Sequence, residues 1–146
     1  SQNSKNGALE RNLFDGIMVE DLEPKLGVER PTFVFDYPAE RGALARLKPD
    51  DLRVAERFEL YIGGLELANG FSELVNSEEQ RRRFHRENEN RQSVGKSVYS
   101  IPEKFLAELD QMPPSAGIAL GVDRLVMVFL DIEPIDEVVA FTPEEL

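Results

Sequence analysis

Residues 56–74, ERFELYIGGLELANGFSEL, decide the fold, because they place acidic side chains at intervals within an otherwise strand-forming apolar run. Alternation and composition predict two strands, Phe58 to Ile62 and Leu65 to Leu74. Between them, Gly63-Gly64 can supply the positive φ angles of a two-residue hairpin turn. The stretch therefore predicts an antiparallel hairpin that carries carboxylates, which need a partner if they lie within a packed sheet.

The register of this hairpin brings two of the acids together. A two-residue turn opposes Glu59 to Ala68. It also opposes Tyr61 to Glu66, so Glu59 and Glu66 become diagonal neighbours on one face, with backbone positions roughly 7–8 Å apart. Carboxylate oxygens are hard donors that suit magnesium. We therefore expect Glu59 and Glu66 to bind a magnesium-nucleotide; the alternative is a solvated outer face of the sheet, as for most exposed glutamates.

A third acid, Glu73, joins this face only if the second strand carries one extra residue. The pair Asn69-Gly70 is a suitable bulge site, and a bulge there reverses the alternation that follows. Asn69, Phe71 and Glu73 would then share the acidic face. A lone carboxylate suits an ammonium group, so this pattern favours a pocket for a cationic ligand beside the nucleotide site.

A second motif, GIALGVDRLVMVFL at residues 117–130, predicts a buried strand that turns directly into an apolar helix. Glycine and alanine occupy alternate positions from 117 to 121 and leave room above the backbone for a flat ligand such as adenine. In the first helical turn, Arg124 could present its guanidinium to phosphate oxygens. The open alternatives are that the glycines only allow close packing and that Arg124 only pairs with Asp123 or another acid.

Together the two motifs resemble the catalytic domain of class II aminoacyl-tRNA synthetases, and in particular the lysine branch, whose last signature reads Gly-x-Gly-x-Gly-x-Asp/Glu-Arg. The flanking sequences RPTFVFDYP at 30–38 and Leu44-Ala45 resemble the strand and loop before the acidic hairpin of that branch. The resemblance implies an α+β fold, a mainly antiparallel sheet flanked by helices. Residues 1–146 would form a single domain, the C-terminal half of such a catalytic domain, with residues 1–7 as a disordered or artificial tail.

The resemblance also implies a role for each candidate residue. Glu59 and Glu66 would bind magnesium and the phosphates of ATP, and Arg124 would be the catalytic residue that clamps the γ-phosphate. Glu73 would contact the amino group of the substrate. The implied sets are Glu66, Leu67, Gly121 and Arg124 for ATP, and Asn69, Phe71, Glu73 and Ala119 for the amino acid. These roles suit formation of an aminoacyl adenylate, which depends on positioning and charge neutralisation.

One departure from the signature is Ala119, which stands where lysyl-tRNA synthetases carry the middle glycine. The same alanine is typical of a stand-alone branch of the family that attaches β-lysine to elongation factor P. The sequence from Leu13 to Phe33 and at Tyr37-Pro38-Ala39 also resembles this branch more closely. The implied partners are lysine or β-lysine and elongation factor P. The alternatives are the C-terminal part of a lysyl-tRNA synthetase acting on tRNA-Lys, and a noncatalytic fragment that binds a ligand or partner.

A second departure concerns completeness. Class II sites also use an arginine-bearing strand pair that binds the α-phosphate, and a helix and strand that form a dimer. Nothing between Ser1 and Gly27 resembles either. By family the protein would be an ATP-dependent ligase and a homodimer, whereas we expect this chain alone to be catalytically incomplete.

Composition limits the partners. The 146 residues include no cysteine, which excludes disulfides and thiolate metal sites, and no long apolar run, so we expect no membrane partner and a cytoplasmic setting. The formal net charge of −11 argues against nonspecific binding of nucleic acid, which needs lysine and arginine to neutralise phosphates. This charge disfavours a tRNA partner for the chain itself.

Two helices complete the predicted scaffold. Apolar residues at helical spacing predict an amphipathic helix over residues 8–23. Ser77-Glu78-Glu79-Gln80 has the spacing of a capping box and predicts a helix that reaches about Asn90. We interpret the run from Arg81 to Arg83 as a solvated helix face with local ion pairs, in preference to an RNA contact.

Overall fold

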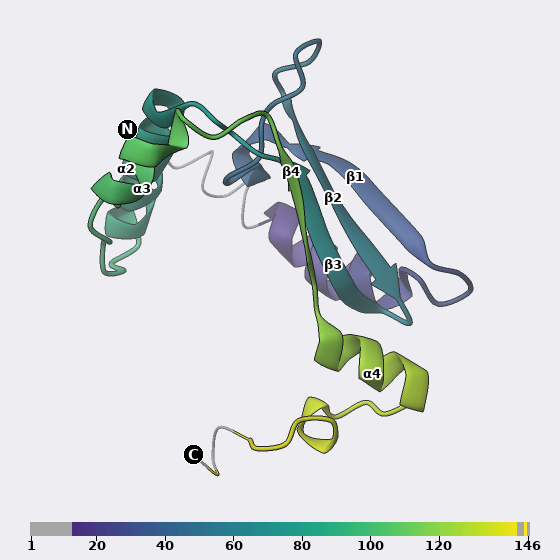
Figure 1. Ribbon diagram of the computed structural model, residues 1–146. Coiled ribbons are helices and arrows are strands. Elements are labelled where there is room, and N and C mark those ends of the chain that lie inside the picture. Colours follow the sequence, from purple (N-terminus) through teal and green to yellow (C-terminus); the bar gives the residue numbers. More distant parts are fainter. Residues whose placement is uncertain (1–12, 143–144, 146) are drawn as a thin grey trace. The chain divides into compact units, whose positions relative to one another are not determined.

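A computed structural model describes residues 13–142 and 145 of the chain (Figure 1). These residues group into two compact units, and each is described by itself. Unit 1 contains the described residues up to Phe35, Phe58–Gly70 and those from Ile118 onward; unit 2 contains Asp36–Arg57 and Phe71–Gly117. The single domain over residues 1–146 stays a prediction, and the expected tail at residues 1–7 lies outside the described residues.

Four strands form one sheet in the order β1-β2-β3-β4. Their bounds are Thr32–Pro38 for β1, Val54–Ile62 for β2, Leu65–Ser72 for β3 and Ala116–Leu120 for β4. The predicted turn between β2 and β3 is confirmed, because Gly63 and Gly64 have φ angles of 61° and 78°, which suit glycine. The antiparallel sheet with flanking helices confirms the α+β class.

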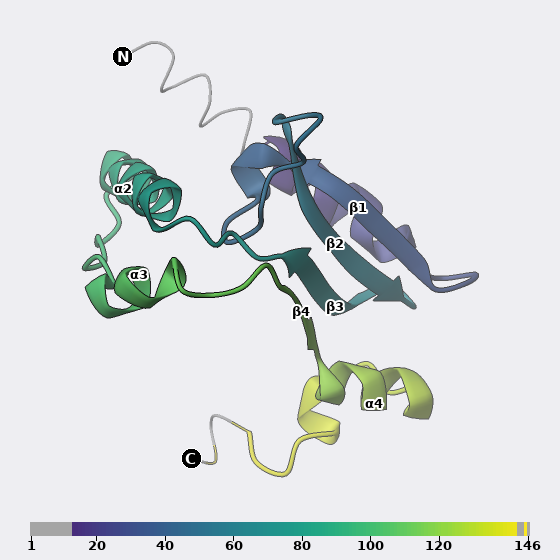
Figure 2. The ribbon, with the colours of Figure 1, turned by 45° about the horizontal axis from the view of Figure 1, so that its top comes forward.

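The longer helices are α2 Ser77–Ser93, α3 Glu103–Leu109 and α4 Val122–Leu130. Shorter helical turns are η1 Ile17–Leu22, η2 Glu23–Lys25, η3 Ala39–Arg41 and η4 Ile135–Glu137. Within unit 2, α2 and α3 lie side by side (Figure 2). The predicted helix over residues 8–23 is confirmed from 13 to 22, and residues 8–12 lie outside the described part. Among the residues that the structure describes, no helix has the length and hydropathy of a membrane span.

In unit 1, the segment after η2 packs on the β2-β3 turn. The backbone N–H groups of Gly63 and Gly64 donate to the carbonyl oxygens of Gly27 and Leu26, each at 2.9 Å. Gly27 has a φ of 74°, and a Cβ there would collide with the backbone of Tyr61. Only glycine satisfies both conditions, so Gly27 allows the N-terminal segment to approach the hairpin.

The second motif forms the predicted strand and helix, since β4 leads through Gly121 directly into α4 (Figure 1). The prediction of a buried strand is wrong, because all five residues of β4 are exposed. β4 is the last strand in the sheet order and has a neighbouring strand on one side only, which contributes to this exposure. An apolar sequence alone cannot distinguish an edge strand from a central one.

In unit 2, the N-cap of α2 differs from the prediction. The side-chain Oδ1 of Asn76, one residue before the expected Ser77, accepts a hydrogen bond of 2.8 Å from the backbone N–H of Glu79. The N–H and hydroxyl of Ser77 donate instead to the carboxylate of Asp110, at 2.8 and 2.6 Å. Ser77 is therefore hydrogen-bonded to Asp110, which is distant in sequence, and Asn76 caps the helix instead.

Candidate functional site

Unit 1 contains a cavity of about 310 Å³ between β3 and the start of α4. Its volume is at the lower end of the range for small-molecule sites, roughly 300–1,000 Å³. Six residues predicted for ATP or amino-acid binding line it: Glu66, Leu67, Asn69, Ala119, Gly121 and Arg124. The structure therefore gathers side chains from the two sequence motifs around one cavity.

The α4 helix begins against β3 and thereby fixes Arg124. The backbone N–H of Gly121 donates to the carbonyl of Leu67 at 2.8 Å. One turn later, Nη1 of Arg124 donates to the backbone carbonyl of Glu66 at 2.7 Å and lies 3.6 Å from its Oε2. The Arg124 side chain is 47% exposed, and guanidinium carries five N–H donors in all. Arg124 is therefore held in place through Nη1, and its other N–H groups are suited to bind an anion.

The small residues of β4 share a face with Asn69. Because Gly121 pairs with Leu67, the antiparallel register brings Ala119 opposite Asn69, and residues two apart on a strand point to the same side. A Cβ added to Gly121 would make only ordinary contacts, with Arg124 Cδ and the Leu67 carbonyl oxygen at 3.6 Å. Packing does not require glycine at 121, so its missing side chain leaves volume to the cavity.

Beside the cavity-lining Asn69, hydrogen bonds from Tyr61 and Asn69 hold the carboxylate of Glu59. The hydroxyl of Tyr61 donates to Oε2 at 2.6 Å, and Nδ2 of Asn69 donates to Oε1 at 3.2 Å. The Tyr61 hydroxyl also lies 3.3 Å from Oε1 of Glu23 in η2. Glu59 is only 6% exposed, so these partners hold a buried acid in place.

The same contact agrees with the predicted change of face in the second strand, while the bulge itself stays a prediction. Strict alternation from the Gly63-Gly64 turn would put Asn69 and Glu59 on opposite faces, yet Asn69 donates to Glu59. Asn69 therefore shares the face of Glu59, as predicted. The adjacent residues Leu67 and Ala68 are both buried, as expected where alternation is interrupted.

The acidic side chains of unit 1 could contribute ligands to a magnesium ion but do not form a complete metal site by themselves. Among the described residues, no group of three or more histidine, cysteine or acidic side chains is placed to hold a metal ion. Magnesium usually keeps several waters and binds one or two carboxylates together with substrate phosphates. Glu66 lines the cavity and is partly exposed, and Glu59 supplies a second carboxylate from the neighbouring strand β2. This donor set fits an ion that arrives with a nucleotide.

The other two predicted ligand contacts, Phe71 and Glu73, belong to unit 2. The backbone N–H of Glu73 donates to the carbonyl of Ser115 at 2.9 Å. A Cβ added to Gly117 would lie 2.9 Å from Oε1 of Glu73, so this carboxylate lies directly over the Gly117 backbone. Phe71 is partly buried in the same unit. With any larger residue at 117, the Glu73 carboxylate would have to move from this position.

Sequence reasoning missed some of the cavity lining. Asp123 precedes Arg124 in the signature, so the motif itself contained the signal for it. Ile135 of η4 also lines the cavity, but nothing in its local sequence indicates this. Its position follows from how the chain folds back after α4, which no short motif encodes.

Comparison with known proteins identifies the family. Residues 18–145 match the model described as "tRNA synthetases class II (D, K and N)". This match covers most of the chain, and the chain belongs to the class II aminoacyl-tRNA synthetase family, as the sequence motifs predicted.

Curated relatives indicate the branch. The chain is 48% identical over 130 residues to "Elongation factor P--(R)-beta-lysine ligase" of Proteus mirabilis (strain HI4320), covering 88% of this chain and 40% of the relative. It is 50% identical over 131 residues to the protein of the same name from Erwinia tasmaniensis, covering 89% and 40%. The chain thus spans about 40% of the length of these relatives. The predicted resemblance to the β-lysine ligase branch is confirmed.

Proposed function

We propose that the protein carrying this chain is an ATP-dependent ligase that activates β-lysine, or lysine, as an adenylate and transfers it to elongation factor P. The observation that carries the proposal is the anchored guanidinium of Arg124 at the edge of a cavity lined by Glu66, by Ala119 of β4 and by Gly121. The names of relatives about half identical to this chain support the same assignment.

ATP would bind the cavity of unit 1. Arg124 would bind the γ-phosphate, because its one anchored donor leaves the other N–H groups available to anionic oxygens. Gly121 and Leu67 would lie against the nucleotide, where the chain offers backbone and little side-chain volume. Glu66 and Glu59 would hold magnesium, which neutralises phosphate charge when bound.

The amino acid would use a second set of residues. The carboxylate of Glu73 would bind the cationic amino group, and Asn69 and Phe71 would contact the rest of the substrate. Hydrogen bonding between Asn69 and Glu59 orients the amide for that purpose. Ala119 adds one methyl group to the face that Asn69 occupies, and we propose that this methyl group favours β-lysine over α-lysine.

The chemistry needs no nucleophile from the protein. A carboxylate oxygen of the amino acid attacks the α-phosphorus of ATP, a new P–O bond forms, the bond to the bridging oxygen breaks, and pyrophosphate leaves. The acceptor amine of elongation factor P then attacks the carbonyl carbon of the adenylate, and AMP leaves. Both steps depend on positioning and on charge neutralisation, and Arg124, Glu66 and Glu73 would provide these.

The proposed activity also indicates where the protein acts. We propose that the protein acts in the cytoplasm, where its acceptor and ATP are available, and as a homodimer, as the family implies. The net charge of −11 leaves little attraction between this chain and tRNA, which favours a protein acceptor.

Amino-acid-dependent exchange of pyrophosphate into ATP tests the proposal. The full-length gene product is assayed with α-lysine and β-lysine separately, and Arg124→Ala is the control. We expect exchange that favours β-lysine, and a loss of about 100-fold or more in Arg124→Ala, as for removal of a charge-stabilising group. Transfer of the activated β-lysine is then offered to elongation factor P and to tRNA-Lys. No exchange with either amino acid, or transfer to tRNA-Lys alone, would contradict the proposal.

A further inference from the structure

We propose that Arg83 is a positioning residue for Glu73: from α2 it holds the backbone segment 43–46, which pairs with the strand end that carries Glu73. The inference rests on the proposed function only for the amino-binding role of Glu73. The contacts that carry it all lie within unit 2.

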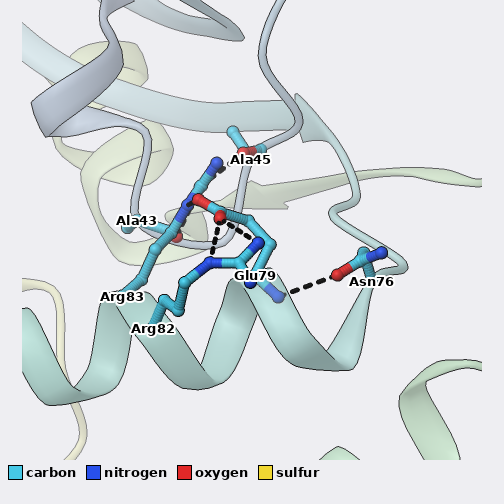
Figure 3. Close-up of polar contacts among 6 residues, drawn as sticks. All are labelled: Ala43, Ala45, Asn76, Glu79, Arg82 and Arg83. Atoms are coloured by element: carbon cyan, nitrogen blue, oxygen red, sulfur yellow. Dashed lines mark hydrogen bonds and ion pairs between the residues drawn. The ribbon is translucent and has the colours of Figure 1, made fainter.

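Arg83 differs from the neighbouring arginines of α2 because its guanidinium is directed at backbone carbonyls. Its Nη1 donates to the carbonyl oxygens of Ala43 at 3.0 Å and Ala45 at 2.7 Å (Figure 3). The side chain is 13% exposed. The interpretation of the Arg81 to Arg83 run as a solvated face is therefore wrong at Arg83. A charged donor with little exposure is expected to hold its acceptors firmly.

Glu79 fixes the other side of this guanidinium. Nε of Arg83 donates to Oε1 of Glu79 at 3.1 Å. Glu79 lies in the first turn of α2, and its own N–H is capped by Asn76 (Figure 3). Burial opposes ionisation of Glu79, but the hydrogen bonds from Arg83 and Arg82 outweigh it and hold the pKa of this carboxyl below its usual value. Glu79 is thus a charged and well-placed anchor.

The segment that Arg83 holds is paired with the end of β3. Ala45 and Glu73 form an antiparallel bridge. On either side of it, the N–H of Arg46 donates to the Ser72 carbonyl at 2.8 Å, and the N–H of Leu74 donates to the Leu44 carbonyl at 2.9 Å. The position of the Glu73 backbone is therefore coupled to the position of this segment.

The segment also contains backbone strain. Ala43 has a φ of 44°, in the left-handed region that residues with a Cβ rarely adopt. Such a conformation persists where surrounding contacts hold it. The bond from Arg83 to the Ala43 carbonyl is a contact of this kind. Without it, we expect the turn to relax and the paired residues 44–46 to shift.

Arg82 provides a matched control. It occupies the same helix and shares Glu79 as a partner, with Nη2 2.9 Å from Oε2, and it also lies 3.8 Å from Glu78. Its side chain is 57% exposed and its ion pairs lie on α2 itself. Replacing Arg82 removes the same charge and a Glu79 contact but leaves the carbonyls of Ala43 and Ala45 bonded.

The test compares Arg83→Gln, Arg83→Lys and Arg82→Gln in the full-length gene product. In pyrophosphate exchange, we expect Arg83→Gln to raise the KM for the amino acid about tenfold and the KM for ATP less than about twofold. Arg83→Lys should recover part of the loss, because an ammonium group can still reach a carbonyl. Arg82→Gln should match the wild type. Equal rises in both KM values for Arg83→Gln, or the same change in Arg82→Gln, would overturn the inference.

Hydrogen exchange separates this inference from the proposed function. In Arg83→Gln, the amides of Arg46 and Leu74 should exchange about tenfold faster than in the wild type, whereas Arg82→Gln should leave them unchanged. This measurement needs no catalytic activity. Unchanged amide exchange in Arg83→Gln would overturn the positioning role even if the enzyme activates β-lysine. Faster exchange together with an inactive wild type would support the role while contradicting the proposed function.

Discussion

The two units place their acidic side chains by different means. In unit 1, Glu59 receives a hydrogen bond from Tyr61, two residues along the same strand, and Glu66 lies two residues beyond the Gly63-Gly64 turn. In unit 2, the backbone of Glu73 pairs with Ala45 and Ser115, which lie 28 and 42 positions away in the sequence. Local contacts leave a pattern in the sequence, whereas distant contacts do not.

The largest expected effect tests the local packing of unit 1. Gly27→Ala should lower the free energy of unfolding by about 3 kcal/mol or more, because the new Cβ collides with the Tyr61 backbone at a positive φ. Urea denaturation measures the change. The matched control is Gly16→Ala, where an added Cβ meets nothing within 4 Å and the backbone is helical. This control should raise stability by about 0.5–1 kcal/mol. Equal destabilisation by the two variants would contradict the packing described for Gly27.

The next effect tests the buried acid of the hairpin. Tyr61→Phe removes the donor to Oε2 of Glu59, which is buried, and should lower the free energy of unfolding by about 2 kcal/mol. Tyr99→Phe is the control, since the side chain of Tyr99 is mostly exposed, and it should change stability by less than about 0.5 kcal/mol. If Tyr61→Phe lowers the free energy of unfolding no more than Tyr99→Phe does, the hydrogen bond to Glu59 contributes little to stability.

Two glycine substitutions, one in each unit, should change the KM values for different substrates. In Gly117→Ala, the new Cβ must displace the Glu73 carboxylate, so the KM for the amino acid should rise about tenfold while the KM for ATP stays within about twofold. In Gly121→Ala, the methyl group enters the cavity without a clash, and the KM for ATP should rise instead. Pyrophosphate exchange measures both constants. The reverse pattern would contradict the roles assigned to Glu73 and to the cavity.

These glycines also show what sequence could predict. The turn at Gly63-Gly64 and the strand-to-helix junction at Gly121 were predicted from residue type and order, because each depends on neighbours in the chain. The exposure of β4, the cap at Asn76 and the role of Arg83 were not. An edge position, the bond from Ser77 to Asp110 and the bonds from Arg83 to Ala43 and Ala45 all depend on segments distant in sequence.

The smallest expected effect is on how the stability of unit 2 changes with pH. Hydrogen bonds from Ser72 and Arg46 hold the pKa of Glu56 below its usual value of 4.5. A lowered pKa in the folded state means that this stabilisation is complete above the unfolded-state value and is lost as pH falls through the lower folded-state value. Glu56→Gln should therefore reduce stability at neutral pH by no more than about 1 kcal/mol and flatten the stability profile below pH 4.5. Denaturation curves across this range measure it, and an unchanged acid slope would contradict the assignment.

The proposed site divides its two ligands between the units, because Arg124 would bind the nucleotide and Glu73 the amino acid. Titration calorimetry of the full-length gene product, with ATP and β-lysine added separately, measures this division in Arg124→Ala and Glu73→Gln. We expect Arg124→Ala to weaken the binding of ATP about tenfold or more and the binding of β-lysine less than about twofold, and Glu73→Gln to do the reverse. Equal weakening of both ligands by either variant would contradict it.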